Sequence, residues 1–101
     1  MGFFEKLFGA VGEKHDFKQM MADGAVVIDV RTPQEFEAGN VPNSINIPLN
    51  QVQHKVNKFK SIKKPIILCC ASGNRSGQAT SFLKSQGINE VYNGGGWRRL
   101  I

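Results

Sequence analysis

Apolar runs along the chain alternate with segments whose apolar residues recur at helical spacing. The run at residues 65–70 is continuously apolar, and the run at 25–30 is apolar except for Asp29, which is typical of strands that are buried on both faces. Two shorter strands are predicted at residues 44–47 and 90–93. Helix patterns and helix-end residues fall at 17–21, 32–39, 49–59 and 76–86. Strands that are separated by helices predict right-handed crossovers and a parallel sheet.

This pattern predicts an α/β fold with a small, mostly parallel central sheet of about five strands, flanked by helices on both faces. In such sheets ligands bind at the carboxyl ends of the strands. The run 65–70 ends at Cys70, so we expect a functional site in the residues that follow Cys70.

Local residue choices mark one helix start with particular clarity. Thr32 and Glu35 have the spacing of a capping box, Pro33 occupies the first helical position, and Gly39 follows as a stop. A second local feature lies at the N-terminus. Residues 1–12 predict an amphipathic segment with phenylalanines on one face, which we expect to pack on a domain formed by residues 13–101, with docking onto a membrane surface or a partner as the alternative.

Composition fits one globular domain. The chain has 101 residues, of which 41% are hydrophobic and 21% charged, values that are ordinary for a globular protein. No apolar run approaches the roughly 18 residues of a membrane span, so no transmembrane segment is predicted. The first residues lack the basic region of a secretory signal, and we expect a cytoplasmic location.

Charge is distributed unevenly between the two halves of the chain. Residues 1–50 hold 4 Lys/Arg and 7 Asp/Glu, whereas residues 51–101 hold 9 Lys/Arg and one acid. A basic half favours an anionic partner and could steer a small anion to a site there, and a solvated helix face explains it equally well. Nucleic acid is not expected, because no nucleic-acid motif is present and the lysines are hardly interleaved with aromatic residues. These lysines are Lys55, Lys58, Lys60, Lys63 and Lys64.

The only two cysteines, Cys69 and Cys70, are adjacent. Two neighbouring residues do not form a disulfide scaffold, and a disulfide between them needs a strained peptide. A zinc site is disfavoured because the two histidines lie far from this pair in the sequence, so we expect no metal and no cofactor. Two explanations of the cysteine pair remain, which are reactive thiol chemistry and simple burial in the core.

The segment after Cys70 has the character of an anion-binding loop. Gly73 and Asn74 tolerate the positive φ of a tight turn, which would direct backbone N–H groups at the sulfur. The helix that starts near Ser76 adds its positive dipole end, and Arg75 adds a full charge. We therefore expect Cys70 to be an accessible thiolate near neutral pH, with a buried structural cysteine as the alternative. The expected substrate-binding residues are Ala71, Ser72, Gly73, Asn74, Arg75 and Ser76.

Three segments, in the order and spacing of the family, resemble the single-domain rhodaneses, which are thiosulfate sulfurtransferases. Residues 70–76 resemble the active-site pattern C-x-x-G-x-R-S, and residues 29–39 resemble the signature D-V-R-x-x-x-E-F-x-x-G. Residues 95–97 resemble the closing G-G-W block. The chain departs from the family at Asn40, where histidine is usual, and at residues 43–44, where Gly-Ala is usual.

The resemblance implies a rhodanese-like fold and a two-step sulfur transfer through a persulfide on Cys70. A small anionic donor such as thiosulfate, or a persulfide, would give its sulfane sulfur to the Cys70 thiolate. A thiol, cyanide or a sulfur-carrier protein would then accept the sulfur. The backbone N–H groups of residues 71–76 would act as the anion hole.

Supporting roles follow for four charged residues. Arg75 either orients a substrate oxyanion or pairs with a carboxylate such as Asp29. Arg31 and Glu35 have the character of a scaffold pair, and Glu35 also has the capping role given above. Ser76 either donates to the sulfur or caps the helix, and capping is the interpretation we prefer.

Two other functions use the same residues differently. Five residues separate Cys69 from Arg75, which is the spacing of the phosphate loop of tyrosine phosphatases, so a phosphatase-like or arsenate-reductase-like enzyme with a Cys69 nucleophile is one alternative. Leu68 stands where that loop usually has histidine. A non-catalytic binding or redox-sensing module is the other alternative.

Overall fold

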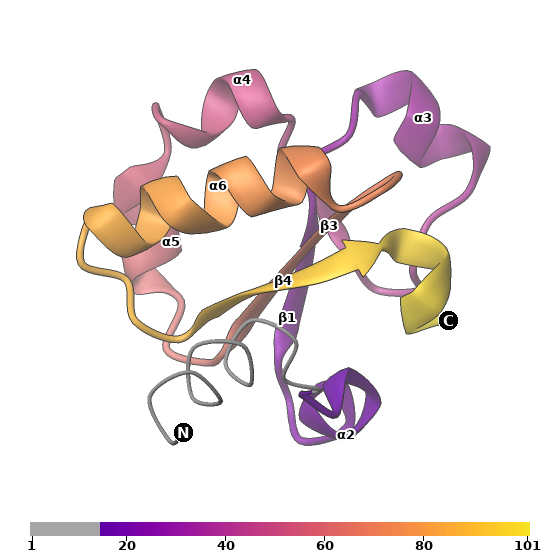
Figure 1. The fold of residues 1–101 in the computed structure, drawn as a ribbon, viewed down its shortest axis with the longest axis horizontal. Helices are drawn as coiled ribbons and strands as arrows, with labels where there is room; N and C mark the ends of the chain where they lie inside the picture. The colour runs from indigo at the N-terminus through magenta and orange to yellow at the C-terminus, as the bar shows by residue number, and fades with distance from the viewer. Residues whose placement is uncertain (1–14) are drawn as a thin grey trace, which may run out of the picture.

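Residues 15–101 are described by a computed structural model of the protein (Figure 1). The predicted amphipathic segment at residues 1–12 lies outside the described residues. The helices are α2 (Phe17–Ala22), α3 (Pro33–Ala38), α4 (Leu49–Val52), α5 (Val56–Ser61), α6 (Asn74–Ser85) and the 3₁₀ turn η1 (Trp97–Leu100). The strands are β1 (Val26–Asp29), β2 (Ile45–Asn46), β3 (Ile66–Cys70) and β4 (Val91–Gly96).

The described strands form one sheet in the order β2-β1-β3-β4, and every neighbouring pair is parallel. The α/β prediction is therefore confirmed, and the sheet is wholly rather than mostly parallel. The expected count of about five strands is wrong for residues 15–101, which form four. Each of the four apolar segments found in the sequence gives one strand, and the segments between them are taken up by helices and turns.

Helix ends follow local chemistry where the sequence supplies it. Thr32 Oγ1 accepts the Glu35 N–H, and Glu35 accepts the Thr32 N–H, so the predicted capping box is formed. The segment 49–59 is two short helices rather than one, because the turn between α4 and α5 closes on hydrogen bonds to carbonyls three residues back. None of the helices within residues 15–101 is long and apolar enough to cross a membrane.

Helices cover both faces of the sheet. In Figure 1, α4 and α6 lie above the strands, α2 lies below them, and η1 follows the end of β4 at the right. The core clusters place α4, α5 and α6 on one face of the sheet and α2 and η1 on the other. One core cluster contains Ile28, Leu68 and Leu83, with Cys70 among them. The other contains Ile67, Trp97 and Leu100, with Cys69 among them. Because successive strand residues point to opposite faces, the two adjacent cysteines belong to different cores.

The end of β4 meets its neighbours through backbone rather than side chains. A Cβ at Gly94 would stand 2.7 Å from Ile67 Cγ2, and a Cβ at Gly96 would stand 2.9 Å from the Ala71 carbonyl oxygen. The glycines therefore let β4 lie close against β3 and against the loop that follows β3. This loop and the ends of β1 and β4 share the carboxyl edge of the sheet.

Candidate active site

The chain turns sharply after Cys70, the last residue of β3. Gly73 is the N-cap of α6, with a left-handed φ of 103°. The helix begins at Asn74, two residues before the position that the sequence predicts. Glycine adopts this backbone conformation without the steric cost that other residues meet. The tight turn brings the first amides of α6 back toward the Cys70 side chain.

Three groups from this loop contact the Cys70 sulfur. The Gly73 N–H donates to Sγ at 3.0 Å, and the Ser76 N–H lies 3.4 Å from Sγ. Ser76 Oγ is also 3.4 Å from Sγ. Amides in the first turn of a helix have no carbonyl partner within that helix. The sulfur therefore receives donors that are otherwise unsatisfied, as the sequence predicts.

Ser76 does not cap α6, so the preferred interpretation of this residue is wrong. The N-cap is Gly73, and no side chain caps the helix. Ser76 is buried in the first turn, where its hydroxyl lies between Cys70 Sγ and Asn93 Oδ1, at 2.7 Å from the latter. A hydroxyl has one proton to donate, so Ser76 can direct it to the sulfur when the sulfur is an anion.

The pKa of Cys70 is the result of two opposed effects. Burial of the thiol raises its pKa, while hydrogen bonds from the Ser76 hydroxyl and from the amides of Ser76, Gly73 and Ser72 lower it. The hydrogen bonds prevail, and the pKa lies below the usual thiol value of 9.0. A lowered pKa of Cys70 agrees with the thiolate that the sequence predicts.

Accessibility differs from the expectation. The side chain of Cys70 has 0% of its surface exposed, although the sequence interpretation requires an accessible sulfur. The reason is the depth of the strand end, where the loop curls over the sulfur in order to supply its amides. The two residues that follow Cys70 in the chain, Ala71 and Ser72, are exposed. The surface of the loop is therefore open to solvent, although the sulfur is not.

Arg75 pairs with Glu35. Its Nη1 donates to Glu35 Oε1 at 2.8 Å, and its Nη2 donates to Oε2 at 3.0 Å. This fork lowers the pKa of the Glu35 carboxyl to about 2, with a further contribution from its hydrogen bond with the Thr32 amide. Arg75 is thus engaged by a carboxylate, as one of our two hypotheses states, and the carboxylate is Glu35 rather than Asp29.

Asp29 pairs with Arg31, so the predicted pair of Arg31 and Glu35 is wrong. Arg31 Nη2 lies 2.7 Å from Asp29 Oδ2, and both side chains are buried. The same nitrogen donates to the Gly39 carbonyl at 2.7 Å, and the guanidinium stacks 4.6 Å from the Trp97 ring. This pair ties β1 to the end of α3 and to the C-terminal turn. Its position indicates a scaffold role.

Asn93 is a contributor that the sequence analysis did not identify. Its Nδ2 donates to the Gly73 carbonyl at 3.1 Å, and its Oδ1 accepts from the Gly95 amide at 3.0 Å and from the Ser76 hydroxyl. The side chain therefore connects β4 to the loop around the sulfur. The rule that directs attention to the carboxyl end of β3 applies equally to β4, and it could have identified Asn93.

Cys69 has none of the character of a nucleophile. It is fully buried in the second core, beside Asp29, and burial raises its pKa to about 12. The loop after β3 closes on the opposite face of the sheet. The geometry therefore gives no support to the phosphatase-like arrangement of Cys69 with Arg75. Within residues 15–101, no three His, Cys, Asp or Glu side chains are grouped so as to hold a metal ion.

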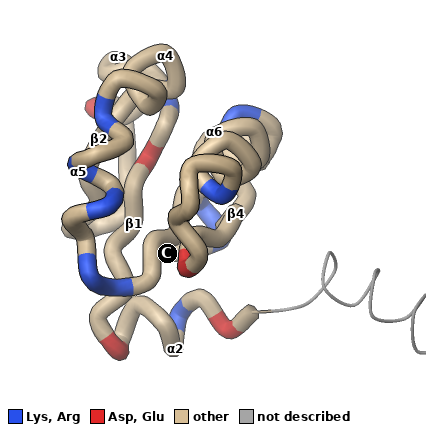
Figure 2. Tube along the Cα trace, turned by 90° about the vertical axis from the view of Figure 1, so that its left-hand side faces the viewer, with Lys and Arg blue, Asp and Glu red and all other residues tan. Residues whose placement is uncertain are grey.

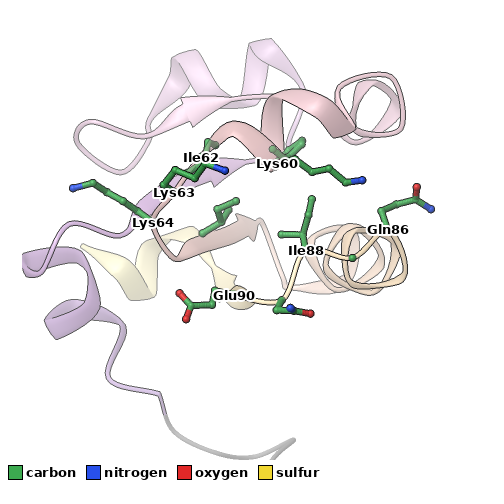
Figure 3. A pocket seen from close by; sticks show the side chains of 11 residues that line it. Lys60, Ile62, Lys63, Lys64, Gln86, Ile88 and Glu90 are labelled. Atoms are coloured by element: carbon green, nitrogen blue, oxygen red, sulfur yellow. The ribbon is translucent and has the colours of Figure 1, made fainter.

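Two hollows lie at opposite ends of the sheet. One, of about 330 Å³, is lined by Arg75 and by residues of the segments that follow β1 and β2, next to the sulfur loop. The other, of about 360 Å³, lies at the amino ends of β3 and β4, with Lys60, Lys63 and Lys64 around it and Ile62 and Ile88 inside it (Figure 3). None of the predicted site residues lines the second hollow.

Comparisons with known proteins agree with the geometry. A family model described as "Rhodanese-like domain" matches residues 13–99. Among curated proteins, the chain is 42% identical over 69 residues to "Uncharacterized protein YqhL" of Bacillus subtilis, with 68% of this chain and 54% of that protein covered. It is 35% identical over 69 residues to "Thiosulfate sulfurtransferase GlpE" of Pseudomonas syringae, with 68% and 64% covered. The chain thus spans less than two thirds of the length of either relative.

A solved structure described as "rhodanese with anions from E. coli" has a similar fold. It superposes with a TM-score of 0.68 at 33% sequence identity, and the match covers 77% of this chain and 92% of the other. The matched region of the chain includes most of the described residues.

Proposed function

The chain belongs to the rhodanese-like domain family, and on that premise we propose that it is a sulfurtransferase that carries sulfane sulfur as a persulfide on Cys70. The observation that carries the proposal is the convergence of two backbone amides and one hydroxyl on the Cys70 sulfur. A neutral thiol needs no such set of donors, whereas a thiolate or a persulfide anion does. The sulfurtransferase names of relatives such as the Pseudomonas syringae protein support the same activity.

Sulfur enters by a displacement at the donor's outer sulfur. The Cys70 thiolate forms a new S–S bond with the sulfane sulfur of the donor, and the donor's own bond to that sulfur breaks. With thiosulfate the leaving group is sulfite, and with a thiol persulfide it is the thiolate. No electrons are gained or lost overall. In the second step a thiol, cyanide or a carrier protein takes the outer sulfur and restores the Cys70 thiolate.

The loop amides are placed to stabilise the negative charge of the sulfur, which moves outward by one atom during the reaction cycle. In the free enzyme the negative charge is on Sγ, and in the persulfide it lies one sulfur further out. Amides fixed by a helix N-terminus stabilise charge without reorientation at the moment of reaction. Because Cys70 is fully buried, the proposal requires the loop after β3 to open for the donor.

We place this chemistry in the cytoplasm. The cytoplasm is a reducing compartment, in which the Cys70 thiol would stay available for the reaction. A reducing compartment also supplies the thiols that would accept the sulfur.

Mass measurement of the intact protein tests the proposal. Incubation with thiosulfate, or with a persulfide of a small thiol, should add one sulfur atom per chain, and cyanide should remove it. The Cys70→Ala variant should gain nothing. The Cys69→Ala variant is the matched control, since it removes the neighbouring sulfur and should still gain one atom.

The same measurement separates the alternatives. If no sulfane donor adds sulfur to the folded protein, the sulfurtransferase proposal is wrong and a binding or redox-sensing module is favoured. Retention of sulfur uptake in Cys70→Ala, with loss in Cys69→Ala, would instead place the nucleophile at position 69.

A further inference from the structure

Charge around the sulfur is nearly absent once ion pairs are considered. The loop side chains at residues 71–74 are uncharged, so Arg75 is the only charged residue of the loop. Both terminal nitrogens of Arg75 are directed at the two oxygens of Glu35. The two side chains are 33% and 37% exposed, so they form part of the surface beside the sulfur loop. The guanidinium face that would grip an oxyanion is therefore already occupied.

Glu35 is held in place from its other side. Its Oε1 accepts from the Thr32 amide at 3.0 Å and from Thr32 Oγ1 at 3.1 Å, which are contacts of the capping box of α3. Movement of Glu35 away from Arg75 would also disrupt the first turn of α3. The ion pair is thus a fixed part of the fold rather than a chance contact of two mobile side chains.

The other cations at this edge do not replace Arg75. Arg31 is buried against Asp29, the Gly39 carbonyl and Trp97. Arg98 and Arg99 are both exposed on η1. Arg98 lies 4.8 Å from the centroid of the Trp97 ring, and Arg99 Nη1 lies 3.6 Å from where a Cβ of Gly95 would stand. Exposed arginines are screened by solvent and contribute little to anion binding.

The hollow beside Arg75 is suited to an uncharged body. Its volume is about 330 Å³, and its lining includes Thr32, Gln34, Pro48, Asn50 and Gln51. Arg75 is the only charged residue among those that line it, and its charge is matched by Glu35. A pocket of this size accommodates a small organic molecule, whereas thiosulfate would leave most of it empty.

We propose that Glu35 withholds Arg75 from the donor, so that the site takes its sulfur from the persulfide of an organic thiol with an uncharged body, in preference to a sulfur oxyanion. This inference rests on the proposed function and specifies its donor class. The Cys70 thiolate forms an S–S bond with the outer sulfur of the persulfide R–S–S⁻, the donor's own S–S bond breaks, and R–S⁻ leaves and takes a proton from water. The transfer is redox-neutral and needs no further reactant.

Three donors test the preference in the wild-type protein. The persulfide of N-acetylcysteine methyl ester has an uncharged body, the persulfide of N-acetylcysteine adds one carboxylate, and thiosulfate is a small dianion. The expected order of kcat/KM for sulfur loading of Cys70 is methyl ester, then free acid, then thiosulfate. An equal or higher kcat/KM for thiosulfate than for the methyl ester would overturn the inference.

Glu35→Gln tests the residue itself. The amide oxygen keeps an acceptor for Thr32, while the charge that engages Arg75 is lost. We expect kcat/KM for thiosulfate to rise roughly tenfold, the scale of one freed charge-assisted contact, while the methyl-ester persulfide changes less than about twofold. Glu37→Gln is the matched control, because it removes the same charge from an exposed position on the same helix and should leave both donors within about twofold.

A second substitution shows whether Arg75 causes the higher kcat/KM for thiosulfate in Glu35→Gln. The double variant Glu35→Gln, Arg75→Gln should lose the gain with thiosulfate. A gain that persists without Arg75, or no gain in Glu35→Gln, would overturn the inference. Neither result would touch the proposed function, which fails only if Cys70 takes sulfur from none of the three donors. The wild-type donor order decides the matter if Glu35→Gln does not fold.

Discussion

The two ends of the parallel sheet present positive charge in different ways. At the carboxyl end, Arg31 and Arg75 are both paired with carboxylates, and backbone amides surround the sulfur. At the amino end, three exposed lysines line a hollow together with isoleucines, Gln86 and Glu90 (Figure 3). Figure 2 shows the basic positions along α5 and the segment that joins it to β3. The net charge of the C-terminal half therefore lies mainly away from the reactive sulfur.

This difference shows why a charge count is a poor guide to the site. Fixed amides at close range act on one atom, whereas exposed lysines raise the potential over a wide surface and are screened by salt. The interpretation of the lysines as a solvated helix face fits the structure better than steering toward Cys70.

The largest expected contrast is between the adjacent cysteines. Burial raises the pKa of Cys69 to about 12, whereas hydrogen bonds from the loop lower the pKa of Cys70 below its usual value, so at neutral pH Cys70 has much the larger thiolate fraction. Iodoacetamide should therefore alkylate Cys70 before Cys69. The rate in Cys69→Ala and in Cys70→Ala, followed by peptide mass across pH, measures this preference. Comparable rates in the two variants would contradict the role assigned to the amides.

The pKa shifts of the two cysteines make the stability of the fold depend on pH in opposite directions. The folded pKa of Cys69 is raised, so its contribution is complete below about pH 9 and is lost as the pH rises toward 12, by up to about 1.4 kcal/mol per unit. The folded pKa of Cys70 is lowered, so its contribution is present above the unfolded pKa and is lost as the pH falls through the folded value. Urea denaturation of the wild type and of Cys69→Ala should give a difference in the free energy of unfolding that is constant below about pH 9, where it reflects the lost packing, and that changes only in alkaline buffer.

Gly73→Ala should have the next largest effect. Alanine at a φ of 103° is strained, and its Cβ would stand 3.2 Å from Gly95 Cα, so the amide should move off the sulfur. A misplacement of this kind lowers the rate of sulfur transfer by about a hundredfold. Gly87→Ala is the matched control, since its φ is 92° with open space around the Cβ. Gly87→Ala should lose stability by about 1 kcal/mol without loss of rate. An equal loss of rate in Gly87→Ala would contradict the role assigned to the Gly73 amide.

Asn93→Ala should lower the transfer rate about tenfold. It removes the contacts to the Gly73 carbonyl, the Gly95 amide and the Ser76 hydroxyl, so the loop loses its connection to β4. A role in positioning also predicts a higher pKa for Cys70 in the pH profile of alkylation, which a general loss of stability would not produce. Asn89→Ala, an exposed change near the start of β4, should alter neither quantity.

Neutralisation of the lysines at the amino end of the sheet should have the smallest effect on the rate of sulfur loading. Replacement of Lys60, Lys63 and Lys64 with glutamine should change the rate of sulfur loading by less than about twofold at physiological salt, because exposed charges at a distance are screened. Electrostatic steering would instead give a loss of about tenfold or more that disappears at high salt. Loading rates at two ionic strengths distinguish the two results.

The sequence predicted the elements of this fold well, because each depended on local chemistry. The apolar runs at 25–30 and 65–70, the capping box at Thr32 and the loop after Cys70 all depend on residues close together in the chain. Gly73 and its amide could likewise be expected, since a strand that turns at once into a helix needs a residue of this kind.

The pairing of charges could not be predicted in the same way. Asp29 and Glu35 are six residues apart, and either could have reached Arg31 or Arg75. The choice depends on which face of β1 and which turn of α3 points to the loop, and that is fixed only when the sheet is assembled. Asn93 was missed for a similar reason, since its partners are 17 and 20 residues away in sequence. The burial of Cys70 could not be predicted either, because it depends on how the loop after β3 folds over the strand end.

The glycine-lined end of β4 has a consequence for anyone who wishes to redesign donor selectivity. Positions 94 and 96 leave no room for a new side chain, and a side chain at position 95 would have to adopt a φ of 82°. A mutant library directed at this strand would mostly yield proteins that fail to assemble. Substitutions are more usefully directed at Gln34, Asn50 and Gln51, which line the hollow beside Arg75 and have open space around them.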